Sequence, residues 1–151
     1  MAGGTMTEWS VALKDVRKTY RMGSIAVPAL RGISLQVARG EFLAIAGSSG
    51  CGKTTLLNII GGLDRADSGE VLVEGENLQL LSAAGLAGLR LRRIGFVFQA
   101  YNLLPVLTAL ENAEFTLLLQ GMPARERRER VERLFSEIGL TGLETDRKSV
   151  V

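Results

Sequence analysis

The pattern of apolar and polar residues predicts strands in the first third of the chain. Residues 9–20, WSVALKDVRKTY, alternate apolar and polar side chains, as expected for an antiparallel strand with one buried face. Residues 33–37 alternate in the same way, and a turn at Arg39–Gly40 leads into the more continuously apolar segment 42–46. Because an uninterrupted apolar run is typical of a strand covered on both faces, we expect residues 42–46 to lie inside the sheet.

The middle of the chain mixes helical and strand patterns. Residues 53–60 repeat with a helical period, and residues 67–78, DSGEVLVEGENL, predict a short strand with a hairpin turn at Glu74–Gly75. A helix capped by its first residue is expected over residues 82–92. The following segment 93–99, RIGFVFQ, predicts another buried strand.

The last third of the chain is predicted to be helical. Thr108 and Glu111 have the spacing of a capping box, which starts a helix that runs to about Gln120. A second helix is expected from Pro123. Its predicted apolar face consists of Val131, Leu134, Phe135 and Ile138. The predicted organisation is therefore an α/β body over residues 1–100 followed by a helical segment over residues 101–151.

Composition and charge exclude several classes of function. Hydrophobic residues make up 46% of the 151 residues, which is typical of a globular domain, and no apolar run reaches the length of a membrane helix. The net charge of only +2 does not favour a nucleic-acid partner. The single cysteine excludes an internal disulfide. The absence of histidine excludes catalysis by histidine and metal sites with histidine ligands. With no secretory signal at the N-terminus, we expect a cytoplasmic protein.

One basic stretch needs a separate explanation. Residues 124–135, ARERRERVERLF, contain five arginines, and a nucleic-acid-binding stripe is one interpretation. Three glutamates alternate with them, and Glu126–Arg130 and Glu129–Arg133 have the i,i+4 spacing of favourable ion pairs. We therefore favour a solvated amphipathic helix.

The stretch GSSGCGKTT, residues 47–55, carries the chemistry. Gly47, Gly52, Lys53 and Thr54 occupy the fixed positions of the phosphate-loop pattern G-x-x-x-x-G-K-[ST]. Glycines let successive amides turn toward one anion, and the start of the next helix adds unpaired amides and a positive dipole. Lys53 is suited to the β- and γ-phosphates, the Thr54 hydroxyl to Mg²⁺ and Thr55 to the α-phosphate. The candidate nucleotide-binding residues of the loop are Gly47, Ser48, Ser49, Gly50, Cys51, Gly52, Lys53, Thr54 and Thr55.

Other interpretations of this loop have less support. A glycine-rich turn without a ligand is one alternative, but the predicted strand before the loop and helix after it argue against it. The glycine spacing does not fit the dinucleotide-binding pattern G-x-G-x-x-G. The chain contains neither the D-x-x-G nor the N-K-x-D motif of small GTPases. A small-molecule kinase stays open, although no residue marks an acceptor site. Cys51 fits the small position where serine is common, and an oxidation-sensitive thiol is the alternative.

Three stretches together resemble the ATP-binding subunit of an ABC transporter: residues 17–20, RKTY; residues 40–71, from GEFLAIAG to DSGEV; and residues 93–112, RIGFVFQAYNLLPVLTALEN. The resemblance covers about residues 9–143 and is greatest to the lipoprotein-releasing and macrolide-export branch. It implies a P-loop NTPase core with N-terminal antiparallel strands and a partial helical subdomain. It also implies ATP and Mg²⁺ as cofactors, membrane-spanning partner subunits, a second ATP-binding subunit, and a location on the inner face of the membrane.

The resemblance implies roles for residues outside the loop. Tyr20 matches the aromatic residue that stacks on adenine; a half-buried tyrosine at a strand end is the alternative. Gln99 matches the glutamine that approaches Mg²⁺ and the γ-phosphate, so we predict Lys53 and Gln99 as catalytic residues and Thr54 and Gln99 as metal-binding residues. Tyr101 and residues 103–106 would contact the membrane partner, unless they fold back onto the core.

The chain lacks the motifs that this family uses to hydrolyse ATP. It contains no apolar strand ending in Asp-Glu, no LSGGQ motif and no histidine. We therefore expect the N-terminal portion of an ABC ATPase, with an incomplete parallel sheet, that binds ATP without turning it over. A non-catalytic nucleotide-binding module or decoy is the alternative.

Overall fold

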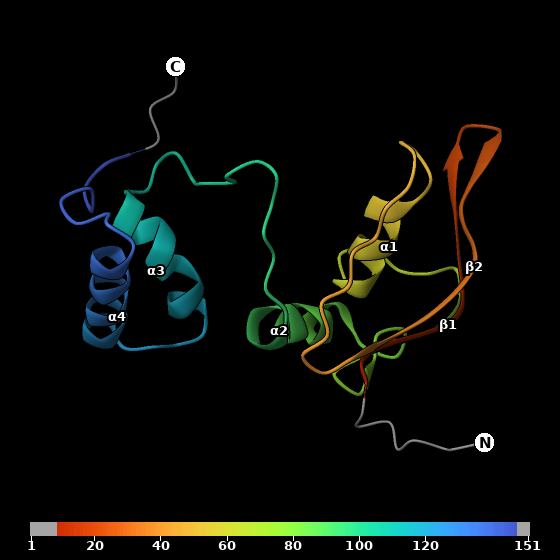
Figure 1. The fold of residues 1–151 in the computed structure, drawn as a ribbon, viewed down its shortest axis with the longest axis horizontal. Coiled ribbons are helices and arrows are strands. Elements are labelled where there is room, and N and C mark those ends of the chain that lie inside the picture. Colours follow the sequence, from red (N-terminus) through yellow and green to blue (C-terminus); the bar gives the residue numbers. More distant parts are fainter. Residues whose placement is uncertain (1–8, 148–151) are drawn as a thin grey trace. The chain divides into compact units, whose positions relative to one another are not determined.

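The computed structural model describes residues 9–147 in two compact units. The first unit ends at Ile94 and the second begins at Gly95. In Figure 1 the first unit runs from red to green and the second from green to blue. Each unit has its own hydrophobic cluster.

The first unit is built on a four-stranded antiparallel sheet with the order β2-β1-β3-β4. Strands β1 (Trp9–Met22) and β2 (Ile25–Ala38) form a long hairpin, drawn in red and orange in Figure 1. Strands β3 (Ser68–Val73) and β4 (Glu76–Asn77) extend the sheet beyond β1. The predicted N-terminal antiparallel strands are confirmed.

A bulge in β1 changes which of its side chains are buried. Leu13 and Val16 are both buried, although residues i and i+3 of a regular strand point to opposite faces. The register toward β2 shifts between these two residues. Asp15 lies within this irregular stretch with a positive φ of 46°. An extra residue in one strand shifts the alternation of faces by one, so both apolar side chains reach the core.

Two helices cover the buried face of this sheet. Helix α1 (Lys53–Ile60) contributes Leu56 and Ile59 to the core, and helix α2 (Ala83–Arg93) contributes Leu86 and Leu89. They pack with Leu13, Val16, Leu30, Val71, Val73 and Leu78. Helix α2 begins as predicted, because the Ser82 hydroxyl accepts a hydrogen bond from the Gly85 amide at 3.1 Å.

The two predicted buried strands at residues 42–46 and 93–99 are wrong. Neither segment forms a strand, and the side chains of Phe42 and Val97 are 95% and 102% exposed. A strand exists only through hydrogen bonds to a neighbouring strand, and neither segment has one within residues 9–147. Only Ile45 of the first segment packs against the core.

The second unit pairs helix α3 (Ala109–Leu119) with helix α4 (Ala124–Glu137). The predicted capping box is confirmed: the Glu111 amide donates to the Thr108 hydroxyl at 3.2 Å, and the Thr108 amide donates to the Glu111 carboxylate at 2.8 Å. Leu110, Val131 and Phe135 form the buried centre of this unit.

The exposed face of α4 differs from the prediction in two respects. Leu134 and Ile138, expected on the buried face, are about half exposed, because a single helix covers a narrower stripe than a complete core would. The ion pairs along α4 are Arg125–Glu129 and Arg128–Glu132, at 2.8 and 2.9 Å, rather than the two expected pairs. They are nonetheless i,i+4 pairs on a solvated helix.

Asn112 fixes the loop that precedes α3. Its side-chain amide donates to the carbonyl oxygens of Leu104, Leu107 and Thr108 at 3.1, 3.2 and 2.9 Å. Its side-chain oxygen accepts a hydrogen bond from the Leu104 amide at 2.8 Å. One polar side chain therefore holds the backbone of residues 104–108 against the first turn of the helix.

Candidate functional site

The phosphate loop ends where α1 begins, at a helix terminus that no side chain caps. Gly52 holds the N-cap position in a left-handed conformation, and the first helical bond joins the Leu56 amide to the Gly52 carbonyl at 2.9 Å. The amides of residues 53–55 have no partner in the helix ladder. The first turn also has no acidic residue, so the positive end of α1 is free to attract an anion.

Gly52 is required by the surroundings of the loop. A Cβ atom at this position would lie 2.5 Å from the Ala29 carbonyl oxygen on β2, and φ is +99°. Gly50 also has a left-handed φ, of +78°, but open space surrounds its missing side chain. The backbone of β2 thus leaves no room for a side chain at the turn that orients the first amides of α1.

Lys53 reaches back over the loop from the first position of α1. Its ammonium group donates to the carbonyl oxygens of Gly47 and Ser48, both at 2.7 Å, and lies 3.6 Å from the Cys51 sulfur. Within residues 9–147 Lys53 forms no ion pair with a carboxylate. Its positive charge is therefore positioned above the loop but not neutralised.

The remaining polar groups of the loop are accessible. Ser48, Ser49, Cys51 and Thr54 are exposed, and Thr55 is partly buried. A hollow of about 310 Å³ adjoins the loop at Gly50 and Cys51. Its other wall is formed by β2 residues Pro28, Ala29, Leu30, Arg31 and Ile33.

Tyr20 lies near the end of β1 and contacts a residue beyond the end of α1. Its backbone pairs with Val27, two residues before the Ala29 carbonyl that abuts Gly52. Its hydroxyl donates to the Asp64 carboxylate at 2.7 Å, beyond the end of α1. The Lys18 ammonium lies 5.2 Å from the centre of its ring.

Sequence reasoning missed Asp64 and Lys18, which together fix Tyr20. Lys18 donates to Asp64 at 2.8 Å, in an ion pair whose two side chains are 12% and 29% exposed. Partial burial raises the pKa of Asp64, but the hydrogen bonds from Lys18, Tyr20 and the Arg65 amide outweigh it and lower the pKa below its usual value. No motif spacing signals this cluster, because the partners are 44 and 46 residues apart.

Gln99 is exposed and belongs to the second unit, whereas the loop belongs to the first. Its role beside the phosphates stays a prediction.

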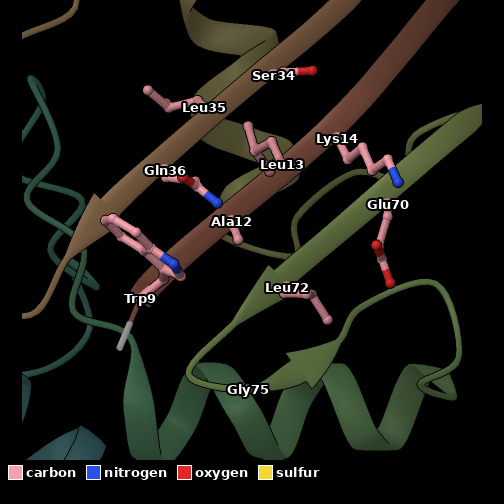
Figure 2. A pocket seen from close by; sticks show the side chains of 10 residues that line it. All are labelled: Trp9, Ala12, Leu13, Lys14, Ser34, Leu35, Gln36, Glu70, Leu72 and Gly75. Atoms are coloured by element: carbon pink, nitrogen blue, oxygen red, sulfur yellow. The ribbon is translucent and has the colours of Figure 1, made fainter. Parts of the chain in front are cut away.

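A separate pocket lies on the outer face of the sheet. It has a volume of about 470 Å³, and side chains from β1, β2 and β3 line it, including Trp9, Lys14 and Glu70 (Figure 2). Lys14 and Glu70 are register partners on neighbouring strands. No residue of the phosphate loop lines this pocket, so it is separate from the candidate nucleotide site.

Comparison with known proteins identifies the family. Residues 30–150 match the sequence model of a family described as ABC transporter. The chain belongs to the ABC transporter family. An uncharacterized ABC transporter ATP-binding protein of Thermotoga maritima is 52% identical over 128 residues, 85% of this chain and 55% of that protein. The macrolide export ATP-binding/permease protein MacB of Brucella abortus is 46% identical over 140 residues, 93% of this chain and 21% of that protein.

A solved structure supports the fold of this ABC transporter chain. The ATP-binding cassette MJ0796, in a dimeric post-hydrolysis state bound to ADP and Pi, aligns with a TM-score of 0.82 and 41% identity. The alignment covers 91% of this chain and 61% of that one. The predicted α/β fold of an ABC cassette is confirmed, and the chain spans little more than half the length of the Thermotoga relative.

The family match includes the whole phosphate loop and Gln99, whereas Tyr20 precedes the matched residues. In the part of the chain that the structure describes, no helix has both the length and the apolar character to cross a membrane. Nor does any group of three or more histidine, cysteine, aspartate or glutamate side chains there offer a metal site of its own.

Proposed function

We propose that this chain binds MgATP at residues 47–55 as the ATP-binding part of an ABC transporter. The observation that carries the proposal is the uncapped start of α1 beside a lysine bound only by neutral groups. Amides, a helix dipole and an ammonium group converge on one place, and a polyphosphate matches all three. The related MJ0796 cassette is bound to ADP and Pi.

Three residues of the loop and two residues outside it have individual roles in this proposal. The Lys53 ammonium exchanges the carbonyls of Gly47 and Ser48 for β- and γ-phosphate oxygens. The exposed Thr54 hydroxyl is free to hold Mg²⁺, and Thr55 faces the α-phosphate. Tyr20 stacks on the base, and Gln99 approaches the metal and the γ-phosphate.

The few protein ligands at this site fit an Mg²⁺ ion that binds together with the nucleotide. Because no cluster of acidic side chains within residues 9–147 holds a metal alone, most ligands of Mg²⁺ would be phosphate oxygens and water. Bound Mg²⁺ neutralises phosphate charge, and Thr54 supplies the protein oxygen that orients it.

We further propose that this chain binds ATP without hydrolysing it. The sequence of 151 residues has no apolar strand ending in Asp-Glu, no LSGGQ and no histidine. The motif whose glutamate orients an attacking water at the γ-phosphate in this family is therefore missing from these residues. A phosphate-release assay is expected to show no turnover, and turnover that Lys53→Ala abolishes would contradict this.

The proposed partners are membrane-spanning transporter subunits and a second ATP-binding subunit, on the inner face of the membrane. Tyr101 and Val106 are exposed by 87% and 75%, and Leu103 and Leu104 by 43% and 41%. These apolar side chains in the loop before α3 supply a surface for the membrane subunits.

Calorimetric titration with MgATP tests the nucleotide site. Lys53→Ala removes the only charged side chain of the loop, and we expect MgATP affinity to fall by about 10-fold or more. Lys14→Ala is the matched control, since it removes the same charge from the outer face of the sheet. A folded wild-type protein that does not bind MgATP, or equal losses in the two variants, would contradict the proposal.

A further inference from the structure

The ring of Tyr20 is fixed by contacts that lie outside the phosphate loop. The Asp64 carboxylate accepts the Tyr20 hydroxyl at 2.7 Å, the Lys18 ammonium at 2.8 Å and the Arg65 amide at 2.7 Å. The Asp64 amide in turn donates to the Asn58 carbonyl of α1 at 3.2 Å. The hydroxyl end of the ring is thus tied to the end of the helix that begins at the phosphate loop.

Lys18 restricts the ring from a second direction. Its ammonium donates to the Arg65 carbonyl at 2.7 Å as well as to Asp64, and its side chain is only 12% exposed. The same ammonium lies within cation–π distance of the Tyr20 ring, at 5.2 Å. The hydrogen bond at the hydroxyl and the cation over the ring therefore restrict the orientation of the ring from two directions.

We propose that Asp64 and Lys18 are positioning residues that hold the Tyr20 ring ready to stack on the base of the bound nucleotide. This inference rests on the proposed function. Tyr20 remains 38% exposed, so the ring is accessible as well as oriented. An unanchored tyrosine would have to be ordered by the ligand, which lowers affinity by roughly 3- to 10-fold.

The inference separates two parts of one ligand. The phosphates meet the loop at the start of α1, whereas the base meets a ring anchored beyond the end of the same helix. Loss of the anchor should weaken binding of a ligand that carries a base and leave binding of bare triphosphate unchanged. A purely structural role, in which Asp64 only supports the fold around α1, would weaken both ligands alike.

The test compares MgATP with magnesium tripolyphosphate in calorimetric titrations. Tyr20→Phe removes only the hydroxyl, and Asp64→Ala removes its acceptor. We expect each variant to bind MgATP about 3- to 10-fold more weakly and tripolyphosphate within about twofold of wild type. The double variant should lose no more than either single one, because both remove the same hydrogen bond.

Two further variants sharpen the result. Asp64→Asn keeps an acceptor oxygen for the hydroxyl and is expected to bind MgATP more tightly than Asp64→Ala does. Glu129→Ala is the matched control, since it breaks the Arg125 ion pair on α4 and should change neither affinity. Tyr20→Phe also keeps the test valid if Asp64→Ala does not fold.

The outcomes distinguish this inference from the proposed function. Parallel losses for both ligands, or unchanged MgATP binding by Tyr20→Phe, would overturn the positioning role while leaving the phosphate site intact. If the folded wild-type protein binds neither ligand, the proposed function itself is overturned.

Discussion

Gly52 occupies the position where the phosphate loop turns into α1, and two separate constraints act on it. Its φ of +99° lies in the left-handed region, and the Ala29 carbonyl occupies the space where a side chain would begin. Gly50 is subject only to the first constraint, because nothing lies within 4 Å of its missing Cβ. The pair therefore allows backbone strain to be measured apart from steric overlap.

We predict that Gly50→Ala lowers the free energy of unfolding by about 1 to 2 kcal/mol, the cost of a left-handed alanine. Gly52→Ala should lower it by about 3 kcal/mol, because β2 must also move away from the new methyl group. Urea denaturation of both variants and the wild type measures the two values. Equal losses would show that the contact with Ala29 does not constrain the loop.

Asp64 makes stability depend on pH in a defined direction. Its folded-state pKa lies below the ordinary value of 3.8, so the stability it contributes is complete above that value and is lost as pH falls through the folded pKa. We predict that the free energy of unfolding of the wild type exceeds that of Asp64→Asn by about 1 kcal/mol near pH 6. The difference should shrink toward pH 3 in urea titrations. A difference that grows on acidification would contradict the assigned hydrogen bonds.

At the scale of elements, local sequence signals were sufficient to predict where helices begin but not to predict buried strands. Helices α1, α2 and α3 begin where the sequence predicts. For α2 and α3 the reason is local, because the Ser82 and Thr108 hydroxyls each accept a hydrogen bond from the amide three residues later. Helix α1 begins after Gly52 without such a cap. The segments 42–46 and 93–99 have strand-like composition, but pairing depends on distant chain and is not encoded locally. The bulge at Asp15 was likewise unpredictable from alternation alone.

The capping box of α3 gives a prediction at this scale. Thr108→Ala removes the hydroxyl that accepts the Glu111 amide, and we expect a loss of about 1 kcal/mol from the free energy of unfolding of the second unit. Thr116→Ala, at an exposed position within the same helix, is the control and should be neutral or slightly stabilising. Far-ultraviolet circular dichroism during denaturation follows both variants.

For the whole molecule, the division at residue 94/95 has a measurable consequence. The segment that follows α2 carries Phe96, Phe98 and Tyr101, whose side chains are exposed by 36%, 52% and 87% and which form no regular secondary structure. We predict that limited chymotrypsin digestion cuts first in this segment and leaves two fragments of about the size of the two units. Mass spectrometry identifies the cut, and a first cut inside α1 or β1 would contradict the division.

The candidate site combines residues that are continuous in sequence with residues that are far apart in it, and only the first kind can be predicted from spacing. The loop from Gly47 to Thr55 is continuous in sequence, so spacing alone suffices to predict a phosphate site there. The anchoring of Tyr20 depends on Asp64, which is 44 residues away and carries no recognisable signal. Gln99 belongs to the other unit, and spacing alone does not relate it to the loop.

The four hydrogen bonds of Asn112 have a consequence for how membrane subunits would recognise this chain. Since hydrogen bonds already fix the main chain from Leu104 to Thr108, the proposed membrane partner would lose little entropy in ordering this loop. Selectivity among transporter subunits would then depend on the size and shape of the projecting apolar side chains. Exchanging Val106 or Leu103 for other aliphatic residues would then change which membrane subunits bind, while the hydrogen bonds of Asn112 keep the loop backbone in place.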